Sequence, residues 1–484
     1  MTVPAIRIRP LNAAPMRDDA GYVLYWMIAA RRVTRSYALD RAVEYCRGLG
    51  LPLFVFEPLR AGYLHACDRF HRFVIDGMRE HAEHAAKAGV TYAAYVEPSP
   101  GEGAGLLEAL AARAAVVVTD DYPTFFLPRM VAAAAERLDV KVEAVDGNGL
   151  LPTRAPEREP VTARGYRRFY QGIVMDELAR APSLTPLDDP AARGASIPKL
   201  ARWRFRTLDE LAAPERWLGE LPIDHRIAPT EERGGRAGGL KRWEAFLPKL
   251  DRYGEDGRHP DLETTSGISP WLHFGHVAAH ELFDDIAERA GLDRTRPPKK
   301  PTGKRDGWWG VASGAEELLE QLVCWRELSY AVAEARPDHR EWSALPRWAQ
   351  DTLTEHASDE RPYVYTEDEL EEARTHDAVW NAAQRQLRGE GRVHNYLRML
   401  WGKKILEWSP SPKEALERLV RLNDRWALDG RDPNSYSGIS WTLGHLDRPW
   451  GPVRPIYGTV RYMSSDATIR KLKMKRYLER WGDA

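Results

Sequence analysis

Short apolar runs rich in β-branched and aromatic residues recur through the first 150 residues of the chain. Helical segments such as ALDRAVEYCRGLG and FHRFVIDGMREHAEHAAKAG separate them, and the second ends in Ala-Gly, a common helix C-cap. The five runs are YVLYW (22–26), LFVFEP (53–58), VTYAAYVE (90–97), AAVVVTDD (114–121) and VKVEAV (140–145). Apolar strands that alternate with helices are typical of a parallel sheet covered on both faces. We therefore predict an α/β domain with a doubly wound parallel sheet over residues 1–150.

Two stretches in this half are candidates for a nucleotide site. GEGAGL (101–106) lacks the third glycine of the dinucleotide fingerprint and does not directly follow a strand, so we interpret it as a loop. TDDYP (119–123) follows a strand at the edge where open α/β sheets bind ligands, but we interpret it as a turn with a helix N-cap. The first half therefore gives no nucleotide signature.

Tryptophan is distributed very unevenly along the 484 residues, a length that favours two or three domains. Of 17 tryptophans, only Trp26 lies before residue 200. Residues 151–225 are rich in proline, alanine and charge, which is typical of a connection between domains. We predict an interdomain linker over 151–225 and an all-α, tryptophan-rich domain over 226–484.

The overall charge and the cysteines exclude several classes of protein. A net charge of −1 argues against a chain that is basic throughout, although a local basic patch for nucleic acid stays open. The three cysteines have no metal-ligand spacing, which favours a reducing compartment and predicts no metal site. No apolar run reaches the length of about 18 residues that indicates a membrane helix, and the N-terminus lacks the apolar core of a signal peptide. We predict a cytoplasmic protein.

His273-Phe-Gly-His276 and KMKR (473–476) imitate the paired signatures of class I tRNA synthetases and nucleotidyl transferases. In those proteins the histidine motif follows the first strand of the nucleotide-binding sheet, whereas here it lies in a helical region far from the first strand. A nucleotidyl transferase is therefore only a third hypothesis.

Hydroxyl residues gather ahead of a predicted helix start at Ser269-Pro270, with Tyr253 upstream. Thr264, Thr265, Ser266 and Gly267 lead into this start. A helix N-terminus with several hydroxyls suits an anion such as a diphosphate. An ordinary helix cap is the alternative.

A second candidate site lies on the helix predicted from about Val393 to Trp408. Asn395, Arg398, Trp401 and Trp408 are spaced so that one helix face presents an amide, a guanidinium and two indoles. Trp380 stands just before this helix, across a Gly-Glu-Gly break. Three core indoles would be the ordinary interpretation.

Carboxylate and amide oxygens follow in LNDRWALDGRDPN, at Asn423, Asp429, Asp432 and Asn434. Asp429 is placed to pair with Arg398. Together with the indoles, these donors and acceptors fit a large, planar, redox-active ligand.

Four separated blocks then resemble the photolyase/cryptochrome flavoproteins, and within them the class II cyclobutane pyrimidine dimer photolyases. The blocks are THDAVWNAA, WNAAQ…HNYLRMLWGKKILEW, LNDRWALDGRDPN and RPIYGTVRYM. The resemblance implies a photolyase-like fold, FAD as cofactor, damaged DNA as partner and light-driven repair of pyrimidine dimers by electron transfer from excited reduced FAD.

The resemblance also implies roles for individual residues. Electrons would reach the flavin along Trp401, Trp380 and Trp408, while Gln321 and Asn423 would act beside the reacting groups. The implied FAD contacts are Tyr253, Thr264, Thr265, Ser266, Gly267, Ile268, Ser269, Gln321, Arg326, Asn395, Arg398, Asn423, Asp429 and Asn434. Trp325, Met399 and Trp441 would line the pocket of a flipped-out dimer, and Arg448, Arg461 and the basic run 294–305 would contact DNA.

The sequence departs from the family at two places. Gln321 stands where the class normally has a glutamate that hydrogen-bonds the dimer, so a cryptochrome-like light sensor without repair activity is the main alternative. The N-terminal segment YWMIAARRVTRSYALDRA departs from the family's usual motif, which puts a deazaflavin-type antenna chromophore in doubt. We expect a monomer.

Overall fold

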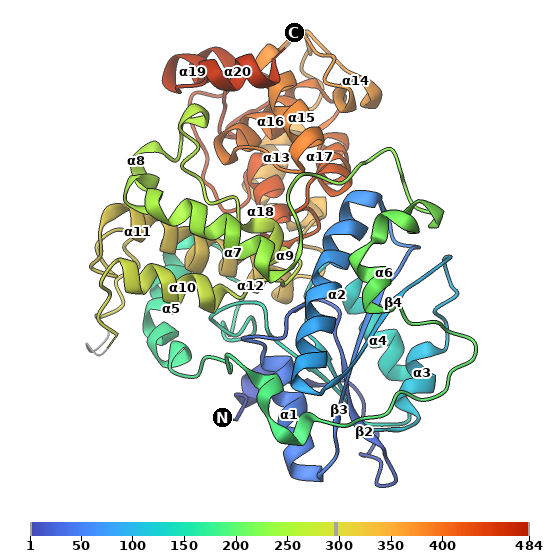
Figure 1. The fold of residues 1–484 in the computed structure, drawn as a ribbon. Coiled ribbons are helices and arrows are strands. Elements are labelled where there is room, and N and C mark those ends of the chain that lie inside the picture. The colour runs from blue at the N-terminus through green and yellow to red at the C-terminus, as the bar shows by residue number, and fades with distance from the viewer. Residues whose placement is uncertain (1, 295–298, 483–484) are drawn as a thin grey trace. The chain divides into compact units, whose positions relative to one another are not determined.

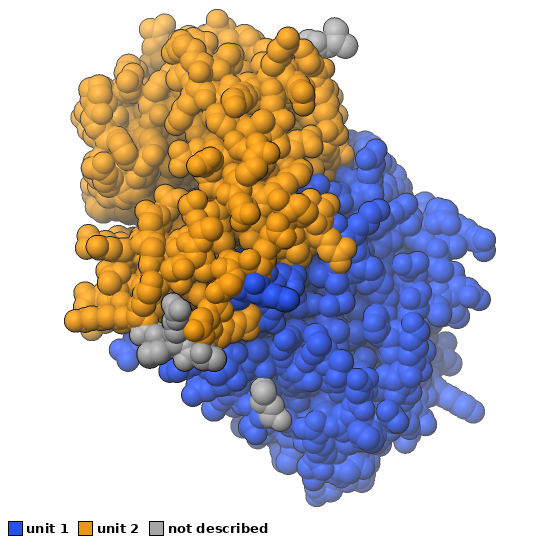
Figure 2. All heavy atoms as spheres, turned by 60° about the vertical axis from the view of Figure 1, so that its left-hand side comes forward, with its two compact units in different colours: residues 1–157, 173–242, 268–288 blue, residues 158–172, 243–267, 289–484 orange. Residues whose placement is uncertain are grey.

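The structure, a computed structural model, describes residues 2–294 and 299–482. Within these ranges the chain forms two compact units, shown separately coloured in Figure 2. Unit 1 comprises residues 1–157, 173–242 and 268–288, and unit 2 comprises residues 158–172, 243–267 and 289–484. The predicted boundaries at 150 and 225 stay a prediction, because compactness alone does not show which segments fold independently.

Unit 1 is built on a six-stranded sheet with helices around it (Figure 1). The strands are β1 (Ile8–Pro10), β2 (Tyr22–Trp26), β3 (Leu53–Leu59), β4 (Thr91–Val96), β5 (Ala114–Asp120) and β6 (Val142–Val145). The main helices are α1 (Tyr37–Leu49), α2 (Asp68–Ala88), α3 (Leu106–Ala111), α4 (Leu127–Arg137), α6 (Leu208–Ala212), α9 (Ser269–His273) and α10 (Ala279–Arg289). The helices α5 (Ala163–Leu178) and α7 (Gly235–Phe246) each have residues in both units.

All five predicted strands are present, and their order is β1-β6-β5-β2-β3-β4. β2 to β6 pair in parallel, as predicted, but β1 pairs antiparallel to β6 through Ile8 and Val145. The sheet is therefore mixed rather than wholly parallel. The sequence analysis missed β1 because a three-residue strand shows no periodicity.

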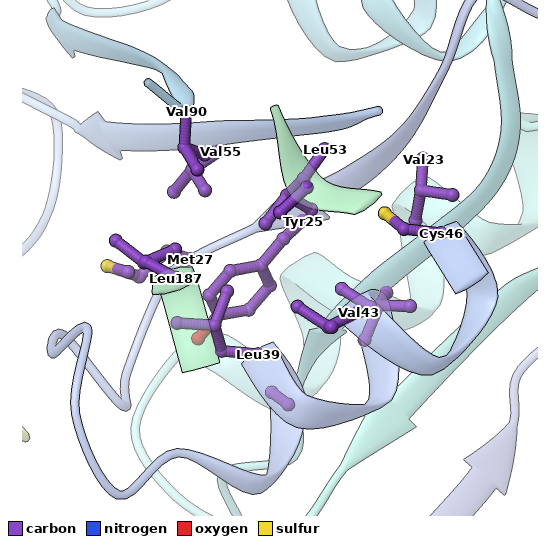
Figure 3. Packing of buried hydrophobic residues seen from close by; sticks show 14 of the residues in the cluster. Val23, Tyr25, Met27, Leu39, Val43, Cys46, Leu53, Val55, Val90 and Leu187 are labelled. Carbon is purple, nitrogen blue, oxygen red and sulfur yellow. The ribbon is translucent and has the colours of Figure 1, made fainter. Parts of the chain in front are cut away.

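Alternate residues of each central strand enter cores on opposite faces of the sheet. Val23 and Tyr25 pack with Val43 of α1 on one face (Figure 3), whereas Leu24 and Trp26 join the cluster on the other face. Both faces are buried, which explains why the strands are apolar throughout. Gly89 caps α2 with a left-handed backbone (φ 72°), as the Ala-Gly ending predicted.

The acidic pair after β5 has a structural role that differs from the predicted N-cap. Asp120 accepts hydrogen bonds from the backbone N–H groups of residues 28–30 at 2.7–3.0 Å and from the Tyr25 hydroxyl at 2.8 Å. Asp121 pairs with Arg9 and Arg154, and α4 begins at Leu127 without a side-chain cap. The N-cap interpretation was wrong, because both carboxylates bind other partners. Asp120 binds the backbone that follows β2, and Asp121 binds two arginines. The GEGAGL segment is a loop up to Gly105, as predicted.

Unit 2 has helices joined by loops and no strand among its described residues. Its helices are α8 (Tyr253–Asp256), α11 (Ser313–Leu319), the π-helix η8 (Glu320–Trp325), α12 (Arg326–Ala335), α13 (Arg347–Glu355), α14 (Glu367–Glu371), α15 (Ala378–Glu390), α16 (Asn395–Trp408), α17 (Pro412–Trp426), α18 (Pro433–Thr442), α19 (Ser465–Lys471) and α20 (Lys475–Trp481). α15 and α17 both pack against α16, as the close grouping in Figure 1 shows. None of the helices in the described residues of either unit has the length and apolar character that crossing a bilayer requires.

Candidate functional site

Three tryptophans form a continuous row of buried rings in unit 2. The ring centroids of Trp380 and Trp401 are 6.4 Å apart with the planes parallel within 2°, and those of Trp380 and Trp408 are 5.5 Å apart and nearly perpendicular. α15 supplies the first ring, and α16 supplies the other two seven residues apart, which places them on one face of that helix. The predicted row is therefore present as a geometric feature, while its role in electron transfer stays a prediction.

The indole N–H groups of this row have different surroundings. Trp401 donates to the side-chain oxygen of Gln384 at 2.9 Å, and Trp380 donates to the backbone oxygen of Trp401 at 3.0 Å. The buried indole nitrogen of Trp408 has no hydrogen-bond partner among the described residues. These bonds fix the orientation of two rings and leave the third held by packing alone.

Arg398 and Asp429 form the predicted ion pair beside this row. The guanidinium donates two hydrogen bonds to the carboxylate, at 2.7 and 3.2 Å, in a bidentate arrangement. Both side chains are partly exposed, 23% and 16%, so the pair is open on one side. A guanidinium held in this way presents a fixed charge and further N–H donors to a ligand.

Asn423, near the end of α17, is held by two buried neighbours. Its amide nitrogen donates to Asp424 at 3.2 Å, and its oxygen accepts from the Ser435 hydroxyl at 3.1 Å. Burial raises the pKa of Asp424, although hydrogen bonds from Tyr436 and Asn423 oppose this effect. An amide nitrogen carries two hydrogens, so one N–H of Asn423 is still available to a ligand.

Two more of the predicted cofactor residues, Asn434 and Arg326, have structural partners. Asn434 and the hydroxyl of Ser329 lie 3.3 Å apart. Asp432 caps α18 by accepting from the backbone N–H of Asn434 at 2.8 Å. The Arg326 guanidinium lies 4.5 Å from the centroid of the Tyr330 ring. Asn395 is exposed at the first turn of α16.

The hydroxyl run ahead of α9 does not form a conventional cap. α9 starts at Ser269 as predicted, but its N-cap residue is Ile268, and no side chain there accepts a capping hydrogen bond. Thr264 is buried (2% exposed), and its hydroxyl has no partner among the described residues. An unsatisfied buried hydroxyl is costly, which favours a ligand contact at Thr264 over the ordinary-cap interpretation. Thr265, Ser266 and Gly267 are half-buried, and Tyr253 packs edge-on against Phe246 at 5.7 Å between centroids.

The predicted lesion-pocket residues come from three neighbouring elements. Gln321 and Trp325 lie on η8, Met399 on α16 and Trp441 on α18, and α18 packs against α12 and α16. All four side chains are half-buried. Gln321 and Trp325 lie in a π-helical turn rather than in an α-helix. The observed π-helix widens this turn, a distortion that is common at functional sites.

A cluster of cations and indoles lies at the end of α18 and beyond it. The Arg461 guanidinium lies 5.5 Å from the Trp441 centroid and 4.0 Å from that of Trp450, and Arg448 lies 4.3 Å from the Trp450 centroid. Asp447 accepts from Arg461 at 3.0 Å and from the Trp450 indole at 3.1 Å. Burial raises the pKa of Asp447, but these hydrogen bonds outweigh it and the net shift is downward. The sequence analysis named Trp441, Arg448 and Arg461 and missed Trp450 and Asp447.

Lys403 is the most unexpected residue of this region. It is fully buried, its ammonium donates to the Thr442 carbonyl at 2.7 Å, and it lies 4.9 Å from the Trp441 centroid. Burial lowers the pKa of Lys403 to about 7. Nothing in the sequence pattern indicated a buried lysine, because lysine is ordinarily a surface residue.

The predicted basic run 294–305 lies partly outside the described residues, at 295–298. Arg305 pairs with Glu317, and Lys299 donates to the Gly307 carbonyl at 3.0 Å. The HxGH motif has a structural use, since the Gly235 N–H donates to the His276 ring at 3.0 Å. Among the described side chains, no group of three histidine, cysteine or carboxylate residues is arranged to hold a metal ion.

Comparison with solved structures defines the class of fold. A class III photolyase from Agrobacterium tumefaciens superposes with a TM-score of 0.68 at 17% identity, covering 97% of this chain and 87% of that chain. A cryptochrome from Synechocystis superposes with a TM-score of 0.64 at 14% identity, covering 95% of this chain and 88% of that chain. This chain therefore has a photolyase-like fold, with an α/β part and a helical part.

Comparison of sequences gives the family. No family model matches the chain. A deoxyribodipyrimidine photo-lyase from Methanothermobacter thermautotrophicus is 32% identical over 485 residues, covering 99% of this chain and 98% of that protein. The chain belongs to the photolyase/cryptochrome family.

Proposed function

We propose that this protein is a class II type photolyase that binds FAD and uses light to repair cyclobutane pyrimidine dimers in DNA. The observation that supports this most directly is the row Trp401–Trp380–Trp408, together with the ion pair that Asp429 forms with Arg398 of α16, the helix that carries Trp401 and Trp408. A row of close indoles has no use in an ATP-dependent transferase, but it suits a cofactor that must be kept reduced by light.

The residues present fit FAD. The unpartnered hydroxyl of Thr264 is available to a phosphate oxygen, the Arg398 guanidinium to a carbonyl of the flavin ring, and the free N–H of Asn423 to a ring nitrogen. When bound, FAD supplies the one-electron chemistry that opens a cyclobutane ring and then recovers the electron. Tyr253, Thr265 to Ser269, Gln321, Arg326, Asn395 and Asn434 are proposed as further contacts.

The protein side chains hold the lesion and shield it from water. A pyrimidine dimer pairs weakly, so extruding it from the duplex requires less free energy than extruding a normal base. We propose that Trp325, Met399 and Trp441 stack on the extruded dimer, and that Arg448 and Arg461 bind phosphates on either side of it. Gln321 donates a hydrogen bond to the dimer but, unlike a glutamic acid, has no proton to transfer.

Gln321 also favours the second candidate function, a cryptochrome-like light sensor that binds FAD but does not repair DNA. Its side chain lies 3.4 Å from the Glu317 carboxylate, to which it donates, so it is already oriented by a neighbour. The Arg448–Trp450–Arg461 cluster favours repair, because a sensor has no need for a stacking surface lined with cations. An antenna chromophore of deazaflavin type stays open.

We also propose that the protein works as a monomer in the cytoplasm. The three cysteines are buried and form no disulfide among the described residues, which suits a reducing compartment.

The test is light-dependent repair of an oligonucleotide with a single dimer, followed by chromatography of the repaired strand. The purified flavin protein is compared with Gln321→Glu, with a dark reaction as control. We expect repair by the natural protein and faster repair by the variant. Photoreduction of the flavin without repair by either protein would favour the light sensor. Repair by Gln321→Glu but not by the natural protein would show that the glutamine at this position abolishes repair.

A further inference from the structure

The KMKR segment (473–476), which imitates a transferase signature, is part of a basic surface in unit 2. It lies where α19 ends and α20 begins, and both helices pack against α15 (Figure 1). Four cationic side chains within seven residues are exposed here: Arg470, Lys471, Lys473 and Arg476. None of the four has an ion-pair partner among the residues that the structure describes. We call these four residues the C-terminal basic segment.

The backbone of this segment is held in place by buried side chains and by hydrogen bonds. Leu472 and Met474 are buried on either side of exposed Lys473. The N–H of Lys473 donates to the His259 ring at 3.1 Å, and its carbonyl accepts from the N–H of Asp261 at 3.1 Å. The Asp261 carboxylate accepts from two backbone N–H groups at the start of α20, at 2.8 and 3.1 Å. Because the backbone is already ordered, binding a ligand here orders only the side chains, which lowers the entropic cost.

The other cations of α20 show the ordinary charge pairing of a solvated helix. Lys475 lies 3.9 Å from the Glu479 carboxylate, one turn further along. Arg480 lies 2.8 Å from the Glu390 carboxylate and 3.8 Å from that of Glu263. The chain as a whole has 70 basic and 71 acidic residues, so four neighbouring cations without ion pairs depart from its balanced surface. A local excess of positive charge of this kind indicates a surface that binds an anion.

The position of the segment favours a nucleic acid as this anion. Arg470 follows Arg461 of the Arg448–Trp450–Arg461 cluster by nine residues, so their Cα atoms are at most about 32 Å apart. That distance corresponds to about nine base pairs of duplex DNA. The Lys471 ammonium also lies 5.3 Å from the centroid of the Tyr396 ring, and cations beside aromatic rings recur in nucleic-acid-binding surfaces. One duplex can therefore contact both the cluster and the C-terminal basic segment.

We propose that the C-terminal basic segment binds the phosphate backbone of the duplex that flanks the lesion. This inference rests on the proposed function, because the lesion fixes where the duplex lies. Phosphate contacts carry no information about sequence or damage, so the segment raises the affinity for damaged and undamaged duplexes alike. The preference for damaged DNA comes from the lesion pocket, and the segment holds the duplex while the dimer is extruded.

The test is fluorescence anisotropy of the flavin-bound protein with damaged and undamaged duplexes at several salt concentrations. The test variant carries three substitutions at exposed positions, Arg470→Gln, Lys473→Gln and Arg476→Gln. The matched control carries Arg347→Gln, Lys475→Gln and Arg480→Gln, which remove three cations that have ion-pair partners. Both variants lose the same net charge, so any difference between them reports where the charge lies. Flavin content and melting temperature show that both variants are folded.

In the test variant we expect the slope of log affinity against log salt concentration to fall by about two to three, and in the control we expect the natural slope. The ratio of affinities for damaged and undamaged duplexes, and the repair rate at saturating DNA, should stay unchanged in the test variant. Equal slopes in the two variants, or a lost preference for damaged DNA in the test variant, would overturn this inference alone. Failure of the natural protein to repair dimers in light would instead overturn the proposed function.

Discussion

At the scale of single residues, Lys403 places an unfavourable buried charge beside Trp441. A fully buried ammonium with one carbonyl partner, Thr442, is unfavourable, since desolvation of a charge is only partly offset by one hydrogen bond and a ring face. The lysine lies beneath the proposed stacking ring, whose other neighbour is the Arg461 guanidinium. Two cations therefore lie near the Trp441 ring, at 4.9 and 5.5 Å from its centroid.

The charge of Lys403 predicts a pH-dependent effect on stability. Its pKa falls from 10.5 to about 7 on folding, so between these values the unfolded chain binds more protons and the folded state gains stability as pH rises. We expect Lys403→Met to be more stable than the natural protein at pH 7. The advantage should shrink by up to about 1.4 kcal/mol per pH unit toward pH 10. Urea unfolding across this range measures it, and an advantage that is constant with pH would contradict the shifted pKa.

The Arg398–Asp429 pair gives a second prediction at this scale. Asp429→Asn removes the charged partner but keeps the shape, so the guanidinium loses its fixed orientation. We expect FAD to dissociate about 10- to 100-fold more readily, which corresponds to about 1.4–2.7 kcal/mol and is typical of a charged hydrogen bond. Flavin fluorescence during dialysis measures the release. Asp351→Asn, at an exposed pair with Arg347 on α13, is the control and should retain flavin normally.

At the scale of elements, α16 and α18 approach closely through a glycine. A Cβ built on Gly402 would lie 2.5 Å from Cγ2 of Thr442, whereas one on Gly438 of α18 would meet nothing within 4 Å. Gly402→Ala should therefore destabilise the protein by about 1–3 kcal/mol, because it forces the two helices apart. Gly438→Ala should be neutral or stabilising by up to about 1 kcal/mol. Thermal unfolding compares them, and equal melting temperatures would show that the helix contact is loose.

Some helices and strands could be predicted from the sequence, and others could not. Strands β2 to β6 were predictable because each is a continuous apolar run buried on both faces, and the Arg398–Asp429 pair followed from helix spacing and opposite charge. The π-helix η8 was not predictable, since six residues are too few to distinguish its period from that of an α-helix. Tyr365 packs on Trp408 at 5.3 Å between ring centroids. It precedes Trp408 by more than forty residues and lies outside the regular helices, so no periodicity indicated this contact. Sequence patterns report local geometry, and this contact depends on tertiary packing.

At the scale of the whole molecule, charge distribution matters more than total charge. The net charge of −1 gives no general attraction to DNA, so binding must depend on local cations such as Arg448 and Arg461. Asp447 neutralises part of Arg461 through two hydrogen bonds and at the same time holds the guanidinium against Trp441 and Trp450. Arg448 is exposed and is therefore more available to a phosphate than Arg461.

This arrangement predicts how DNA binding depends on salt. Each phosphate contact that is lost lowers the slope of log affinity against log salt concentration by about one. We therefore expect Arg448→Gln to reduce the slope by about one, and Arg461→Gln to reduce it by less while also weakening the preference for dimer-bearing DNA, because Trp441 and Trp450 lose their common partner. Fluorescence anisotropy with damaged and undamaged duplexes, at several salt concentrations, measures both effects. Arg347→Gln, whose side chain is 87% exposed on α13, is the control for a change of surface charge. If all three variants had equal slopes, the Arg448–Trp450–Arg461 cluster would not be a phosphate-binding surface.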